Sequence, residues 1–103
     1  MNTSVAAAID TLASLLRLSD EGLGERVGMT RMVVNNIRRG KRSIKVDDLE
    51  AFARAFDCPI SVLLGGRVEA MRWAGEQAEA GVQNWKILND PDDPWQLTLA
   101  LTA

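Results

Sequence analysis

The sequence predicts a mainly α-helical protein, with five short helices, a C-terminal helix after them, and a strand or hairpin at the end. Three observations predict this fold class. Apolar residues recur at three- and four-residue steps through the first 80 residues, as on one helix face. Ser, Thr and Gly stand where these periodic segments begin and end. The pattern then changes to alternation at Trp95, Leu97, Leu99 and Leu101, which is typical of a half-buried strand.

The first predicted helix spans about Ser4 to Leu16. Its apolar residues share one face: Val5, Ile9, Leu12, Leu15 and Leu16. The second helix follows Ser19, a favourable N-cap, has two carboxylates in its first turn, and runs to about Val27. Gly24 lowers the helix propensity of this segment, so we expect another backbone to approach it closely.

Gly28 and Met29 interrupt the helical pattern. Thr30 then caps a third helix that runs to about Arg39 and ends at Gly40. Val34 and Ile37 are its inward residues. A basic loop, 41–45, leads to a fourth helix over 46–56 with this inward stripe: Leu49, Phe52, Ala53 and Phe56.

Pro59 suits the first position of a short fifth helix that ends at Leu64. The glycine pair Gly65-Gly66 then predicts a hinge or cap. We therefore divide the chain into a domain at residues 1–66 and an extension at residues 67–103.

The extension begins with a predicted helix from about Arg67 to Ala80. Its apolar stripe comprises Val68, Met71, Ala74 or Gly75, Ala78 and Val82. Residues 85–88 and 95–101 can pair as a hairpin around an acidic, proline-containing turn. The extension either completes the monomer core or forms a dimer or partner interface, and we favour the dimer because an isolated hairpin is marginally stable alone. The candidate interface residues are Trp73, Trp85, Trp95, Leu97, Leu99 and Leu101.

The charge of the chain is unevenly distributed. The formal net charge is −2, yet residues 26–45 contain seven Lys or Arg residues and no carboxylate. A solvated helix face normally carries both signs, so this stretch indicates a local polyanionic partner.

Two absences exclude most enzyme classes. The chain has one cysteine, Cys58, and no histidine, which excludes an internal disulfide, a His-dependent triad and the usual zinc sites. No Gly-rich phosphate loop is present. We expect no catalytic activity, cofactor, metal or small-molecule ligand. With no signal-peptide pattern and no membrane-spanning stretch, we expect a cytoplasmic protein.

The second and third predicted helices are joined by a very short turn, which is typical of a helix-turn-helix. The outward side of the third helix carries amides and cations without a carboxylate: Arg31, Met32, Asn35, Asn36 and Arg39. These side-chain types read base edges in the major groove of DNA, since Arg pairs with guanine, Asn with adenine, and an apolar group contacts the thymine methyl.

Residues 18–64, LSDEGLGERVGMTRMVVNNIRRGKRSIKVDDLEAFARAFDCPISVLL, resemble the Cro and phage-repressor type of helix-turn-helix domain, the XRE-like family. The resemblance implies a five-helix domain that binds duplex DNA with its third helix in the major groove. It also implies a location in the cytoplasm or nucleoid of a bacterial host. It implies base reading by Thr30, Arg31, Met32 and Asn36, with Asn35 as a secondary contact. The candidate phosphate contacts are Arg26, Arg38, Arg39, Lys41, Arg42, Ser43 and Lys45.

The sequence departs from the family at three positions. Asp20 stands where the family usually has a phosphate-contacting Gln, and a carboxylate there would repel phosphate. Gly24 stands where the family often has Ala. Arg38 replaces a frequent carboxylate, and it either contacts phosphate or is freely solvated.

Two functional hypotheses follow. The first is a sequence-specific transcriptional regulator, a phage Cro-like protein or repressor that acts on double-stranded DNA as a homodimer. The second is an antitoxin or antirepressor type of protein-interaction module, in which residues 67–103 bind the partner. The acidic, Trp-bearing character of that segment favours the second hypothesis.

Overall fold

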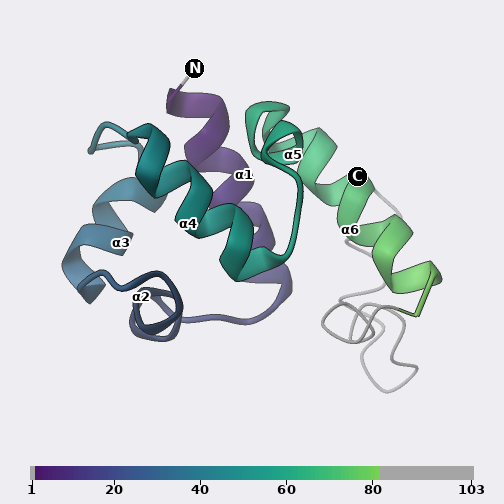
Figure 1. Ribbon diagram of the computed structural model, residues 1–103, viewed down its shortest axis with the longest axis horizontal. Coiled ribbons are helices and arrows are strands. Elements are labelled where there is room, and N and C mark those ends of the chain that lie inside the picture. The colour runs from purple at the N-terminus through teal and green to yellow at the C-terminus, as the bar shows by residue number, and fades with distance from the viewer. Residues whose placement is uncertain (1, 82–103) are drawn as a thin grey trace.

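The computed structural model describes residues 2–81 of the chain as a bundle of helices (Figure 1). They are α1 (Asn2–Leu15), α2 (Asp20–Val27), α3 (Arg31–Arg38), α4 (Val46–Phe56), α5 (Ile60–Leu64) and α6 (Gly66–Glu79). The mainly helical prediction is confirmed, and each boundary lies within two residues of the expected one. The predicted strands at 85–88 and 95–101 lie outside the described residues. Within residues 2–81, no helix is both long and apolar enough to cross a membrane.

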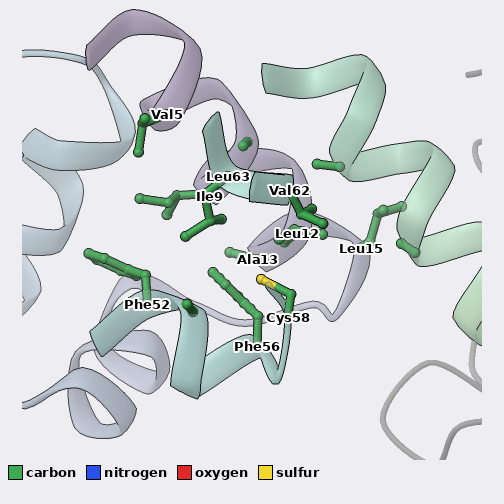
Figure 2. Close-up of a cluster of buried hydrophobic side chains, with 14 of the residues drawn as sticks. Val5, Ile9, Leu12, Ala13, Leu15, Phe52, Phe56, Cys58, Val62 and Leu63 are labelled. Atoms are coloured by element: carbon green, nitrogen blue, oxygen red, sulfur yellow. The ribbon is translucent and has the colours of Figure 1, made fainter. Parts of the chain in front are cut away.

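One buried core joins the helices. Ile9 and Leu12 of α1 lie close to Phe56 of α4 and Leu63 of α5, and all four side chains are removed from solvent (Figure 2). The rings of Phe52 and Phe56 stack with centroids 6.4 Å apart. The apolar stripes predicted for the first five helices face this core, with these residues half-buried at its edge: Leu16, Val27 and Leu49. Burial of these apolar side chains is the main force that holds the helices together.

The sixth helix belongs to the same core. It packs against α1 and α5, and it buries Ala70, Met71 and Ala74 there. Trp73 is half-buried against this core. The predicted stripe is wrong at Val68, which is 67% exposed, because α6 turns Ala70 and Met71 toward its neighbours instead.

The junction of α2 and α3 depends on two caps and a close backbone approach. The Ser19 hydroxyl accepts a hydrogen bond from Gly22 N, and the Thr30 hydroxyl accepts one from Val33 N. Gly28 ends α2 at a positive φ of 74°. A Cβ on Gly24 would lie 2.5 Å from Met29 O, so the expected close approach is confirmed. The tight turn fixes the direction in which α3 leaves α2.

The third helix ends at a glycine, as predicted. Gly40 has a φ of 71°. Its N–H donates to Ile37 O, and Lys41 N donates to Asn36 O over 2.8 Å. These two bonds form a Schellman motif, which satisfies the last carbonyls of α3 and turns the basic loop away from the helix axis.

Candidate nucleic-acid interface

The third helix lies at the edge of the molecule, on the side opposite α6 (Figure 1). Its inner face is held by Val34 and Ile37, which are fully buried against the core. Contacts with α2 and α1 hold it from behind. An apolar inner face therefore anchors α3 and leaves its polar face outward.

The residues predicted to read bases occupy that outer face. Arg31 is exposed, and Met32 is 73% exposed. A large apolar side chain so open to water contributes little to the core and is available to a partner. Asn35 and Asn36 are half-buried. Thr30 is exposed and also serves as the N-cap of α3.

Most of the predicted phosphate contacts are open to solvent. The exposed set comprises Arg26, Arg39, Lys41, Arg42, Ser43 and Lys45. Among residues 2–81, no carboxylate pairs with Arg31, Arg39, Lys41 or Arg42. Their positive charges are therefore not neutralised by the described part of the protein.

Arg38 takes neither of the two roles considered from the sequence. Its side chain is only 16% exposed and is turned back toward α1 and α2. Nε donates to Asp10 over 2.9 Å, and one terminal nitrogen donates to Asp20 over 2.9 Å. The guanidinium also donates to Ser14 Oγ and to Leu18 O. Arg38 is thus neither freely solvated nor left with an open donor fork for a phosphate.

Asp20 is likewise partnered inside the protein. Oδ1 accepts the bond from Arg38, and Oδ2 accepts a bond from Asn35 Nδ2 over 2.9 Å. The phosphate repulsion expected from the sequence is therefore opposed by a guanidinium at contact distance. Asp20 and Arg38, two of the three departures from the family, form one ion pair, which sequence reasoning missed because it treated them separately.

A hollow of about 380 Å³ opens in front of this network. Asp20, Arg31, Met32 and Asn35 line it. It lies between the N-terminal end of α2 and the outer face of α3, and its lining includes three of the predicted base readers.

A metal-ligand cluster or a reactive cysteine would support other chemistry within the described residues. In the part of the chain that the structure describes, no three Cys, Asp or Glu side chains converge as metal ligands. Cys58 is buried, and that burial raises the pKa of its thiol to about 11. The remaining predicted interface residues, Trp85 to Leu101, lie outside the described residues.

Residues 13–63 match the helix-turn-helix family model, which spans the end of α1 through α5. A comparison with curated proteins and one with solved structures gave no match. The matched segment contains the capped turn, the exposed face of α3 and the basic loop. The chain belongs to the helix-turn-helix family of the Cro and phage-repressor type, whose members are DNA-binding regulators.

Proposed function

We propose that this protein is a transcriptional repressor or Cro-like regulator that binds a specific operator with α3 in the major groove. Occupation of the operator would exclude polymerase. The observation that carries the proposal is the outer face of α3, where Arg31 and Met32 stand exposed on a helix without a carboxylate. Such a face suits base edges, since it offers a bidentate donor and an apolar surface.

The proposal divides the interface between two kinds of contact. Thr30, Arg31, Met32 and Asn36 read base edges, with Asn35 beside them. The phosphate contacts are Arg26, Arg39, Lys41, Arg42, Ser43 and Lys45. Arg38 is left out of this set because its guanidinium is engaged by Asp10 and Asp20. Phosphate contacts then supply most of the affinity, and base contacts supply the specificity.

Selection of bound duplexes from a random pool tests this function. We expect a palindrome whose half-sites lie about one helical turn apart. Replacing Arg31 with Ala should cost about 1–3 kcal/mol at one base pair and relax the preference there. Arg54→Ala is the matched control, because Arg54 is an exposed arginine in the last turn of α4, outside the proposed interface. Enrichment of no sequence by the unmodified protein would refute the proposal.

A homodimer is part of the same proposal. Because α6 packs in the core, the interaction role falls to its exposed side and to the residues that follow. Three large apolar residues of α5 and α6 stand exposed: Ile60, Leu64 and Val68. Sedimentation of the full chain measures its oligomeric state. Selection of a single asymmetric DNA site would indicate that the protein binds as a monomer.

The same apolar side chains support the second candidate, a protein-interaction module of the antitoxin or antirepressor type. The measurement that separates the two candidates is duplex binding at physiological salt. A stoichiometric protein complex together with no duplex binding would favour the second candidate.

A further inference from the structure

The Asn35 amide is held by a neighbouring helix. Its Nδ2 donates to Oδ2 of Asp20 over 2.9 Å, across the gap between α3 and the start of α2. Asp20 is fixed in turn, because Oδ1 accepts from Arg38 over 2.9 Å and the carboxylate is only 23% exposed. The orientation of the Asn35 amide therefore depends on the Asp20 carboxylate, which Arg38 holds in place.

The chemistry of the carboxylate decides which end of the amide faces it. An ionised carboxylate only accepts hydrogen bonds, so the nitrogen of Asn35 must lie on the Asp20 side and the oxygen must point away. A neutral amide at position 20 could instead accept or donate, and it would leave both orientations of Asn35 open. Asp20 thus allows only one orientation of the Asn35 amide, whereas an asparagine amide can ordinarily adopt either of two.

The locked amide still offers one donor and one acceptor. Nδ2 carries two hydrogens, of which Asp20 takes one, and Oδ1 has no partner among the described residues. Asn35 lines the hollow in front of α3, together with Arg31 and Met32. An asparagine reads adenine with one acceptor for the N6 amino group and one donor for N7.

We propose that Asp20 is a positioning residue that presets Asn35 to read an adenine of the operator. This inference rests on the proposed function, and it promotes Asn35 from a secondary contact to a reader of one defined base. It also gives Asp20 a role in specificity without any contact with phosphate.

The test is selection from a random duplex pool with the full chain and three variants. Asn35→Ala should lose the preference for adenine at one position of the half-site. Asp20→Asn should lower the preference at that same position by about five- to tenfold and leave the other positions unchanged. The double variant Asp20→Asn with Asn35→Ala should be no worse at that position than Asn35→Ala alone.

Asp10→Asn is the matched control. Asp10 also accepts a bond from Arg38 over 2.9 Å, but it makes no hydrogen bond to Asn35. The variant therefore disturbs Arg38 while leaving the bond between Asp20 and Asn35 in place. It should retain the adenine preference, which separates an effect on Asn35 from a general loosening of α3.

Two measurements that do not require Asp20→Asn serve if that variant does not fold. The first is the NMR signal of the Asn35 side-chain amide, where we expect one proton slowed in exchange with water. The second is a selected duplex carrying 7-deazaadenine, which lacks N7, at the assigned position. It should bind the unmodified protein more weakly and leave the affinity of Asn35→Ala unchanged.

The outcomes separate the two ideas. If the unmodified protein selects no sequence, the proposed function fails and this inference fails with it. If it selects an operator, three results overturn the inference alone. They are an unchanged adenine preference in Asp20→Asn, an equal loss in Asp10→Asn, and a base other than adenine at the position that depends on Asn35.

Discussion

The guanidinium of Arg38 in α3 lies 2.9 Å from the carboxylate of Asp20, the first residue of α2. The same group lies 2.9 Å from Asp10 in α1. One side chain thus joins three helices at the place where the direction of α3 is set. Arg suits this site because its planar fork donates several hydrogen bonds at once.

Replacing Arg38 with Met should lower the free energy of unfolding by about 1–3 kcal/mol, because it leaves the half-buried Asp20 carboxylate without a cation. Asp10→Asn should cost less than about 1 kcal/mol, since the Asp10 side chain is 52% exposed and that pair is screened by solvent. Urea denaturation measures both. Arg39→Met is the control, as Arg39 is exposed and its side chain is unpaired within residues 2–81. Equal losses for the Arg38 and Arg39 variants would contradict the structural role of Arg38.

Gly24 should resist replacement by Ala. The added Cβ would lie 2.5 Å from Met29 O, and backbone must shift to relieve the contact. We expect a loss of about 1–3 kcal/mol in spite of the better helix propensity of Ala. Gly75→Ala in α6 is the opposite case, because nothing lies within 4 Å of its added Cβ, and it should stabilise the protein by up to about 1 kcal/mol. Thermal melts of the two variants measure the difference, and a stable Gly24→Ala protein would show that the turn relaxes easily.

The fold could be predicted from the sequence because its local signals agree. Ser19 and Thr30 cap helices, Gly28 and Gly40 end them, and the apolar spacing identifies the buried faces. Val68 is the exception. Periodicity places Val68 on an apolar stripe, but it does not show which part of that stripe another helix buries.

The site was predicted less completely, for a physical reason. Exposure of Arg31 and Met32 follows from helix periodicity alone. The network of Asp20, Asn35 and Arg38 joins residues up to 18 positions apart, and it depends on the angle at which α2 and α3 cross. No local pattern encodes that angle. Opposite charges at positions 20 and 38 were the one signal that could have revealed the pairing.

Cys58 should make stability depend on alkaline pH. Burial, with a contribution from the charge of Asp57, raises the pKa of the thiol from 9.0 to about 11. The unfolded chain loses this proton at lower pH than the folded one. The stability that Cys58 contributes is therefore complete below about pH 9 and is lost as the pH rises through about 11. Urea denaturation across this range should show a steeper fall for the unmodified protein than for Cys58→Ala.

The same burial predicts low thiol reactivity. At about pH 8 the native protein should react slowly with iodoacetamide, since only the thiolate attacks and little of it forms. Reaction should accelerate once urea unfolds the chain. Rapid labelling of the native protein would contradict burial of the Cys58 thiol. So would a stability that depends on pH equally in the unmodified protein and in Cys58→Ala.

Salt dependence should separate phosphate contacts from base contacts. With about four to six phosphate contacts per protomer, the affinity should fall steeply as the salt concentration rises. Arg42→Ala should weaken binding to the selected operator and to a scrambled duplex alike, and it should reduce the slope of log affinity against log salt by about 1. Arg31→Ala should lower affinity for the operator more than for the scrambled duplex.

Fluorescence anisotropy over a salt series measures both effects, with Arg54→Ala as the control that keeps the original slope. An unchanged slope in Arg42→Ala would remove Arg42 from the phosphate contacts, and equal behaviour of the Arg31 and Arg42 variants would contradict the division between reading and positioning.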